Sequence, residues 1–194
     1  MALPFTEEQR DEIRQRLFES ACRHARSTGV KKTSLDMLTA DAGIAKSSFY
    51  KFFESKEQLF LAVASSWEEK ILSQGALALE ESLDQPNKSR AAAFVYAVFE
   101  AIHSMGIVRF LREDLPYLNE FAPELQAREH CMDSADGIFE QLRRAQITFT
   151  APDETVLSVI RLLYLSILNI GEVGQSFFPA LQELVASACD RLVA

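Results

Sequence analysis

The fold is decided by residues 33–59, TSLDMLTADAGIAKSSFYKFFESKEQL. This stretch predicts a short helix, a tight turn at residues 42–44, a second short helix, and the start of a third helix. Glycine adopts positive φ without steric cost, so Gly43 allows two helices to meet at a steep angle. We therefore predict a helix-turn-helix unit here.

The second short helix has two chemically different faces. At 100° per residue, Phe49 and Phe52 fall on one side of the helix. The residues that point away from that side are Lys46, Ser47, Tyr50 and Lys51. A recognition helix needs such a surface, because lysines neutralise phosphates and short polar side chains reach base edges in the major groove. The pattern alone equally fits a small amphipathic hairpin with a solvated polar face.

Residues 42–59, AGIAKSSFYKFFESKEQL, resemble the signature of the TetR (tetracycline-repressor-like) family of bacterial regulators. That signature has an A-G-V/I turn, a recognition helix with an aromatic-Tyr pair, and F-x-S/N-K-E/D-x-L at the start of the next helix. The resemblance covers about residues 6 to 60 at motif level. The chain departs from it at two positions. Ala45 replaces the usual Ser or Thr and removes an N-cap hydroxyl, and Ser47 replaces a common Gly.

The resemblance implies an all-α architecture of about nine helices, and apolar periodicity without alternating β-branched runs points the same way. It implies an N-terminal three-helix helix-turn-helix DNA-binding domain at residues 1–53. A C-terminal helical bundle for ligand binding and dimerisation would follow at residues 54–194. The residues expected to contact DNA are Thr33, Ser34, Lys46, Ser47, Ser48, Tyr50, Lys51 and Lys56.

Three of these expectations concern helix starts. Either Thr33 or Ser34 can cap the helix that follows, and a capped helix start is also an anion site. Lys56 lies in the first turn of the third helix, where its charge opposes the helix dipole. A phosphate beside it would explain that placement.

Charge is unevenly distributed along the chain. The whole chain of 194 residues has a net charge of −8. Residues 21–56 nevertheless hold seven Lys or Arg against three acidic residues, a local net charge of +4. Residues 61–194 hold ten basic and nineteen acidic residues, a net charge of −9. A basic head with an acidic body limits non-specific association with DNA and permits a focused docking site.

Sequence signals place several further helices. Residues 6–9 fit a capping box at the start of the first helix, and Gly29 suits its end. Pro123 suits the first turn of a helix that runs to about residue 147. The segment 156–170 is apolar almost all round, so we expect it to be buried on most sides.

The last two helices, near residues 156–170 and 177–193, carry enough apolar surface for either a body core or a dimer seam. The resemblance implies a seam, because family members pair through their last two helices into a four-helix bundle. Two recognition helices would then face successive major grooves, roughly 34–36 Å apart, and read a palindromic operator in double-stranded DNA. The residues expected in this homodimer interface are Leu157, Ile160, Tyr164, Leu181, Leu184, Val185 and Ala188.

The body has the composition of a small-molecule site. The chain has fourteen Phe, many of them between residues 94 and 139, with polar groups such as His103 among them. An apolar cavity with a few polar contacts binds small molecules, although a Phe-rich core with outward polar groups gives the same pattern. We expect an apolar or aromatic effector, because no inward cluster of Arg or Lys is evident. The residues expected to line its pocket are Phe99, His103, Phe110, Tyr117, Phe139 and Tyr164.

These features predict a DNA-binding transcriptional regulator, a homodimeric repressor that a small apolar or aromatic ligand releases from its operator. One alternative is a DNA-binding regulator without a small-molecule inducer. Another is an all-α enzyme or carrier. Against that reading, the three His and three Cys show no nucleophile–base or metal-ligand spacing, and no Gly-rich phosphate loop occurs. We therefore expect no catalytic residue, no metal and no cofactor.

Cysteine usage and hydropathy favour a cytoplasmic protein. Cys22, Cys131 and Cys189 are scattered without a C-x-x-C pair, as in a reducing compartment. The N-terminal segment lacks the apolar region of a secretory signal. The most apolar segment, residues 156–170, is too short to span a bilayer and contains Arg161. We expect a soluble protein without a membrane partner.

Overall fold

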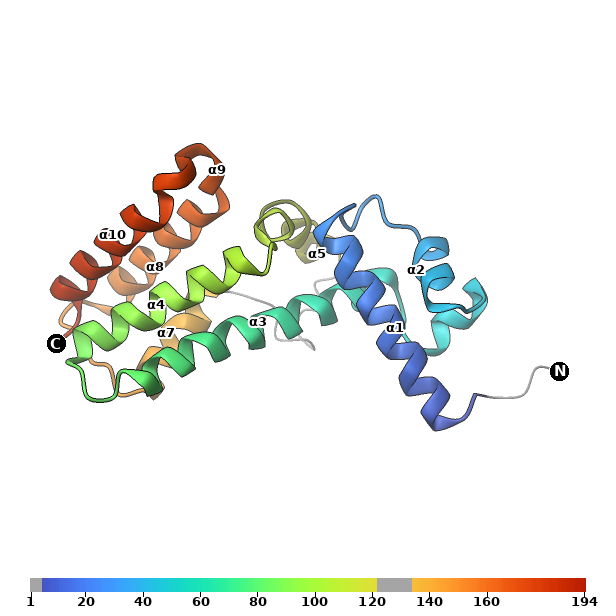
Figure 1. Ribbon diagram of the computed structural model, residues 1–194, viewed down its shortest axis with the longest axis horizontal. Coiled ribbons are helices and arrows are strands. Elements are labelled where there is room, and N and C mark those ends of the chain that lie inside the picture. Colours follow the sequence, from blue (N-terminus) through green and yellow to red (C-terminus); the bar gives the residue numbers. More distant parts are fainter. Residues whose placement is uncertain (1–4, 122–133) are drawn as a thin grey trace. The chain divides into compact units, whose positions relative to one another are not determined.

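The computed structural model describes residues 5–121 and 134–194, and it confirms the all-α prediction. These residues contain nine α-helices (Figure 1). Outside the helices, their only β pairing is an isolated antiparallel bridge between Phe149 and Val193. The start of the helix predicted from Pro123 lies outside the described residues. Its later part is α7 (Ser134–Arg144).

The chain divides into two compact units. The first comprises Met1–Ser66 and Arg109–Cys131, and the second comprises Trp67–Val108 and Met132–Ala194. The division falls within the long helix α3 (Lys56–Glu81). This grouping differs from the predicted division at residues 53 and 54, because a segment from the middle of the chain joins the N-terminal unit.

The first unit contains the helix-turn-helix. It is built from α1 (Glu7–Arg26), α2 (Leu35–Ala42), the 3₁₀ helix η1 (Lys46–Lys51), the first part of α3, the π-helix η2 (Phe110–Asp114) and α5 (Leu115–Phe121). The predicted capping box is present, since the Thr6 hydroxyl accepts the Gln9 N–H at 3.2 Å and the Gln9 side chain accepts the Thr6 N–H at 3.0 Å. Gly43 ends α2 in the left-handed conformation, with φ at 69°, as the tight turn requires.

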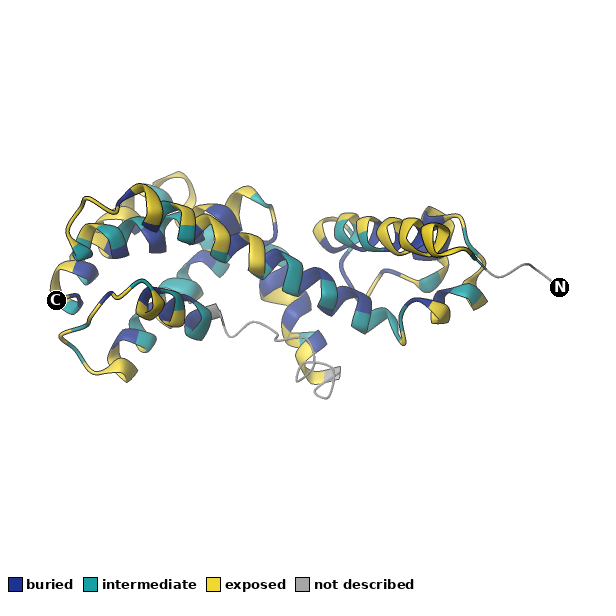
Figure 2. Ribbon diagram, turned by 90° about the horizontal axis from the view of Figure 1, so that it is seen from below, coloured by how far each residue is buried: buried dark blue, intermediate teal, exposed yellow. Residues whose placement is uncertain are grey.

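Buried residues lie on the inner sides of these elements and form the core of the first unit, while exposed residues lie on the outer sides (Figure 2). Its fully buried side chains include Leu17, Leu38, Phe49, Leu59, Phe60 and Phe110. Burial of one such side chain contributes roughly 1.5–3 kcal/mol. The buried Phe49 therefore anchors η1 to this core, and the opposite face of η1 is left at the surface.

The second unit is a bundle around α4. It contains the second part of α3, α4 (Asn87–Ser104), α7, α8 (Asp153–Leu168), α9 (Ile170–Val173), the 3₁₀ helix η3 (Gly174–Ser176) and α10 (Phe177–Leu192). The stripe of α4 that runs from Ala91 to Ile102 is buried, and α4 contacts α7, α8 and α10. The α3 backbone also approaches α4 closely. A Cβ on Gly75 would lie only 2.6 Å from the Phe94 ring.

The prediction that residues 156–170 are buried on most sides is wrong. On α8, Val156, Ile160 and Ile167 are buried, whereas Leu162 is 66% exposed and Leu165 is 54% exposed. The helix packs only one side against the unit, so apolar character all round does not by itself imply burial all round. Among the described residues, no single helix is long and apolar enough to cross a membrane; α8 and Ile170–Leu192 meet those criteria only as a pair bent by 69°.

Candidate DNA-binding surface

The helix-turn-helix exposes the polar face of η1. Phe49 and Phe52 are buried, whereas Tyr50 is 59% exposed and Lys46 and Lys51 are exposed. The element is a 3₁₀ helix rather than the α-helix assumed from 100° per residue. Residues three apart eclipse each other in a 3₁₀ helix, so Phe49 and Phe52 still share one side. The predicted separation into an aromatic inner face and a polar outer face is confirmed.

The starts of α2 and η1 are joined by an ion pair. Lys46 Nζ lies 2.9 Å from Asp36 Oδ2, and both side chains are exposed. Ser34 is the N-cap of α2, where its hydroxyl accepts the Met37 N–H at 3.2 Å. An exposed ion pair contributes only about 0–1 kcal/mol, so Lys46 can leave Asp36 for a stronger anionic partner at little cost. Ser34 and Lys46 thus lie at neighbouring helix starts.

The remaining residues of η1 differ in their surroundings. Lys51 Nζ lies 5.4 Å from the centroid of the Phe5 ring, and the Tyr50 ring meets Phe49 edge-on at 5.6 Å. Ser47 is exposed, while Ser48 is half-buried. Ala45 caps η1 without a side-chain hydrogen bond, as its missing hydroxyl predicted.

Two residues predicted to contact DNA are instead engaged inside the first unit. The Thr33 hydroxyl is buried and donates to the carbonyl oxygen of Gly29 at 2.7 Å, so the cap of α2 is Ser34 alone. Lys56 Nζ donates to the carbonyl oxygens of Val30 and Thr33, both at 2.9 Å. The Lys56 side chain is only 17% exposed. These two carbonyl oxygens explain why a cation lies in the first turn of α3. The sequence-based explanation was a phosphate beside Lys56.

A second pair of charged residues holds the same loop, which runs from Gly29 to Thr33. The Val30 N–H donates to Asp114 Oδ1 at 3.1 Å, and Arg109 donates to the carbonyl oxygen of Ala25 at 2.6 Å. Burial raises the pKa of Asp114, although the Val30 N–H and the Arg109 charge act in the opposite direction. Gly29 has φ at 87°, and a Cβ there would lie 2.8 Å from Arg109 Nη1. No local sequence pattern identifies this set of residues, because 84 positions separate Val30 from Asp114.

Asp41 fixes α2 against α1. Its Oδ2 accepts the Ser20 hydroxyl at 2.6 Å and Arg23 Nη2 at 3.0 Å, and it lies 3.2 Å from His24 Nε2. The Ser20 hydrogen bond, followed by those of His24 and Arg23, lowers the pKa of Asp41 below its usual value, with partial burial opposing them. This network also escaped the sequence analysis, since no local spacing pairs Asp41 with α1. The network holds α2 of the helix-turn-helix in a fixed orientation against α1.

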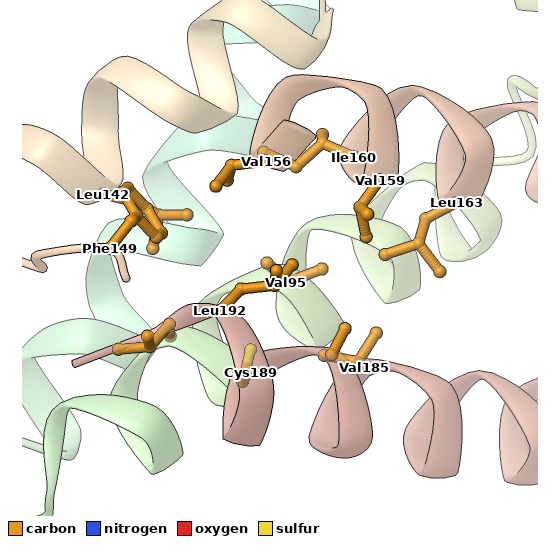
Figure 3. Close-up of a pocket in the computed structure, with 13 residues that line it drawn as sticks. Val95, Leu142, Phe149, Val156, Val159, Ile160, Leu163, Val185, Cys189 and Leu192 are labelled. Atoms are coloured by element: carbon orange, nitrogen blue, oxygen red, sulfur yellow. The ribbon is translucent and has the colours of Figure 1, made fainter. Parts of the chain in front are cut away.

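A cavity in the second unit lies between α4, α7, α8 and α10 (Figure 3). The lining is entirely apolar apart from a thiol and includes Val95, Leu142, Phe149, Ile160, Val185 and Cys189. Burial raises the pKa of the Cys189 thiol to about 11, so the thiol is protonated and unreactive near neutral pH. The cavity volume is about 30 Å³, whereas small-molecule pockets hold roughly 300–1,000 Å³. A ligand could enter only if the helices moved apart.

The residues predicted to line a ligand pocket are not brought together in this cavity. Phe110 and Tyr117 belong to the first unit, where Lys31 Nζ lies 4.7 Å from the centroid of the Tyr117 ring. Phe99, His103, Phe139 and Tyr164 belong to the second unit. None of the six lines the cavity in Figure 3.

The predicted position of His103 in a ligand pocket differs most clearly from the structure. Its side chain is exposed, and its ring lies 5.1 Å from that of Phe178, so the prediction that it faces the interior is wrong. Phe99 and Phe139 are buried as expected. Phe139 stacks on Phe149 with ring centroids 5.4 Å apart, which places it behind the cavity wall.

The residues predicted to form a dimer interface divide by burial. Ile160, Leu181 and Val185 are buried within the second unit, and three others are half-buried: Leu157, Tyr164 and Ala188. Leu184 is 58% exposed. The buried residues cannot meet a partner subunit while they pack their own core, and this corrects their assignment. The exposed leucines of α8, Leu162 and Leu165, were not predicted.

The described residues contain no group of three or more His, Cys, Asp or Glu side chains that could hold a metal ion. Cys22 and Cys189 form no disulfide bond within the described part of the chain, and Cys131 lies outside the described residues.

The first unit buries Phe49 and Phe52 and exposes Lys46 and Lys51 on the opposite face. This arrangement defines a helix-turn-helix protein of the DNA-binding regulator class. Residues 17–63 match the sequence model of the bacterial regulatory proteins of the tetR family. The match covers the helix-turn-helix segment and agrees with the family that the sequence resemblance implied. Among curated proteins, none matches the sequence.

Solved structures share the fold along nearly the whole chain. The fatty acid degradation regulator FadR from Bacillus halodurans is 12% identical, with a TM-score of 0.62 and coverage of 96% of each chain. The ketosteroid transcriptional regulator KstR2 of Mycobacterium tuberculosis is 18% identical, with a TM-score of 0.57 and coverage of 93% of this chain and 95% of its own. The superantigen PfiT is 19% identical, with a TM-score of 0.65 and coverage of 93% and 96%. At these identities the likeness establishes the fold alone, and the three names show that one fold serves different functions.

Proposed function

We propose that the protein is a homodimeric, cytoplasmic repressor that binds a palindromic operator and is released by a small apolar or aromatic ligand. The observation that carries the DNA-binding part is the division of η1. Phe49 of η1 and the adjoining Phe52 are buried in the first unit, whereas the exposed residues of η1 are Lys46, Ser47, Tyr50 and Lys51. Such a helix can enter a major groove without rearranging the core.

The roles of individual residues follow from their chemistry and exposure. Lys46 and Lys51 would neutralise phosphates, and Ser47 and Tyr50 would reach base edges or sugars. Ser34 would present the capped start of α2 to the phosphate backbone, and the half-buried Ser48 would lie at the edge of this surface. Thr33 and Lys56 would instead hold the loop between α1 and α2. That loop sets how α2 and η1 are presented.

The homodimer rests on an exposed apolar face of the second unit. Leu162 and Leu165 on α8 and Leu184 on α10 are each more than half exposed, and α8 and α10 contact each other. Exposed leucines on helices that contact each other are typical of an interaction surface. A two-fold pairing of this face would give a symmetric dimer and therefore a palindromic site.

The effector is the less constrained part of the proposal. The lining of the cavity in Figure 3 fits an apolar molecule. Two proteins of the same fold are named as a fatty acid degradation regulator and a ketosteroid transcriptional regulator. A ligand that separates α8 and α10 from α4 would favour a second state of the unit, and it would lower operator affinity only by binding the two states differently. The small volume of the cavity favours a second candidate, a DNA-binding regulator without a small-molecule inducer.

The test is selection of random duplex DNA by the purified protein at moderate salt. We expect enrichment of a palindrome by the wild-type protein and loss of binding in Tyr50→Ala and Lys51→Ala. Lys70→Ala, which removes an exposed cation from α3 in the second unit, is the matched control and should bind normally. A failure to enrich any sequence at any salt concentration would refute DNA binding. A screen with the selected operator then separates the two candidates, because an inducer-free regulator gives the same footprint with every ligand.

A further inference from the structure

A hollow in the second unit brings two guanidinium groups over an apolar floor. Its volume is about 260 Å³, and it lies between the end of α3, the start of α4 and the last turn of α7. Arg90 enters from α4 and Arg144 from α7. The polar lining also includes Glu80 and Gln141, and the apolar lining consists of Ala76, Leu79, Leu83 and Ala145. This hollow shares no lining residue with the cavity of Figure 3.

Arg90 is incompletely paired at this position. Its Nε atom is buried and has no hydrogen-bond acceptor within the described part of the chain, while Nη1 donates to Asn87 Oδ1 at 3.2 Å. A buried donor without an acceptor costs about 1–3 kcal/mol, and more when it is charged. Arg90 also lies in the first turn of α4, where the helix dipole disfavours a cation. A bound anion would satisfy the guanidinium and the helix start together.

Arg144 is available to the same anion. It is exposed and has no ion pair or hydrogen bond to any described side chain, whereas its neighbour Arg143 is paired with Asp153. Two guanidinium groups and the Glu80 carboxylate give the lining a net charge of +1. That charge favours a monoanion over a phosphate dianion, and the planar guanidinium matches a carboxylate with two parallel hydrogen bonds.

The floor determines the rest of the ligand. Leu79 is buried and Leu83 is largely exposed, so an apolar body laid on the floor would cover leucine surface that water now contacts. Covering apolar surface contributes roughly 25 cal/mol per Å². We propose that this hollow binds an organic monocarboxylate, with the carboxylate between Arg90 and Arg144 and the apolar body over Leu79 and Leu83. The proposal does not depend on DNA binding or on an effector in the cavity of Figure 3.

The test is calorimetric titration of the full chain with sodium octanoate at fixed ionic strength. We expect saturable binding in the wild-type protein and at least tenfold weaker binding in Arg144→Gln and Arg90→Gln. Arg143→Gln, one position away and outside the hollow, is the matched control and should bind like the wild type. Circular dichroism checks folding. If Arg90→Gln fails to fold, the Arg144→Gln variant serves as the test, because Arg144 is exposed.

Two further probes separate the sources of binding. Octanol has the apolar body without the charge, and we expect its binding to be insensitive to Arg144→Gln. Sodium phosphate has the charge without the body, and we expect it to bind at least tenfold more weakly than octanoate. Equal octanoate affinity in the wild type and Arg144→Gln, equal affinity for phosphate and octanoate, or no saturation would each overturn the proposal.

Discussion

Replacing Lys56 with Met separates a structural cation from a DNA-contacting one. Met keeps an unbranched apolar stem of similar length and removes the ammonium group. The wild-type ammonium donates to two carbonyl oxygens, those of Val30 and Thr33, at 2.9 Å each. Both of these residues are buried, so the carbonyls have little water to replace the lost donor.

The expected loss of stability follows from those two hydrogen bonds. A buried acceptor left without its donor costs about 1–3 kcal/mol, and relaxation of the loop should keep the total near about 2 kcal/mol. For a protein of this length, 1 kcal/mol shifts Tm by about 2–4 °C, so we expect Lys56→Met to melt about 4–8 °C lower. Lys51→Met, at an exposed position, should change the free energy of unfolding by less than about 0.5 kcal/mol.

The salt dependence of operator binding should show the opposite contrast. Each phosphate contact adds about 0.9 to the slope of log K against log salt concentration. Because the substitution removes one phosphate contact from each subunit of the proposed dimer, we expect Lys51→Met to lower the magnitude of this slope by about 1.8. Lys56→Met should weaken binding and leave the slope at its wild-type value. The assay is fluorescence anisotropy with the selected operator at several salt concentrations, well below the Tm of both variants.

An exchange of the expected Tm and salt-slope changes between the two variants would contradict the roles assigned to Lys51 and Lys56. A Lys56→Met protein with wild-type Tm and a slope reduced by about 1.8 would show that Lys56 leaves the loop for a phosphate in the complex. Equal slopes for the wild type and Lys51→Met would remove Lys51 from the phosphate contacts.

Three further results are expected. Asp41→Asn should lower the free energy of unfolding by less than about 1 kcal/mol at pH 7. This difference should disappear as the pH falls through the lowered pKa of Asp41, because the unfolded state takes up the proton at higher pH than the folded state. A pH-independent difference in chemical denaturation would contradict this. Gly75→Ala should destabilise by about 1–3 kcal/mol through overpacking against α4, whereas Gly137→Ala, whose Cβ would have ordinary contacts at 3.6 Å, should be neutral or stabilising by up to about 1 kcal/mol. Leu162→Asp combined with Leu184→Asp should yield a monomer in sedimentation velocity, and a persistent dimer would place the interface elsewhere.

Local sequence signals predicted the head well because its main features depend on neighbouring residues. The capping box at Thr6, the turn at Gly43 and the buried pair Phe49 and Phe52 each follow from residues within four positions of one another. The pair also survives the change from α-helix to 3₁₀ helix, because spacing by three keeps residues on one side in both.

Predictions based on helical periodicity were less successful in the second unit. At 100° per residue, His103 lies roughly 40° beyond Phe99, at the edge of the buried stripe of α4, and it turns to solvent. Periodicity identifies a stripe but not its edges. It also cannot tell whether Ile160 or Leu162 faces the core of its own chain, because α8 is apolar on both sides.

Contacts between distant residues gave no signal at all. Asp114 and Lys56 act on the same loop from positions far apart in the sequence. Asp114 does not stand out among the charged residues of its own segment, and the unusual placement of Lys56 indicated a phosphate rather than the loop. Their roles depend on buried backbone groups at Val30 and Thr33, which a sequence pattern does not display.

The assignment of residues 109–121 to the first unit has a consequence during synthesis of the protein. When a ribosome has released α1, α2 and η1, the Val30 amide still lacks its acceptor, because Asp114 follows 84 positions later. At about 5–20 residues per second, that interval lasts roughly 4–17 s. The helix-turn-helix therefore reaches its final form only after all of α4 has been made, and a nascent chain that stops earlier would carry a helix-turn-helix with an unfinished loop.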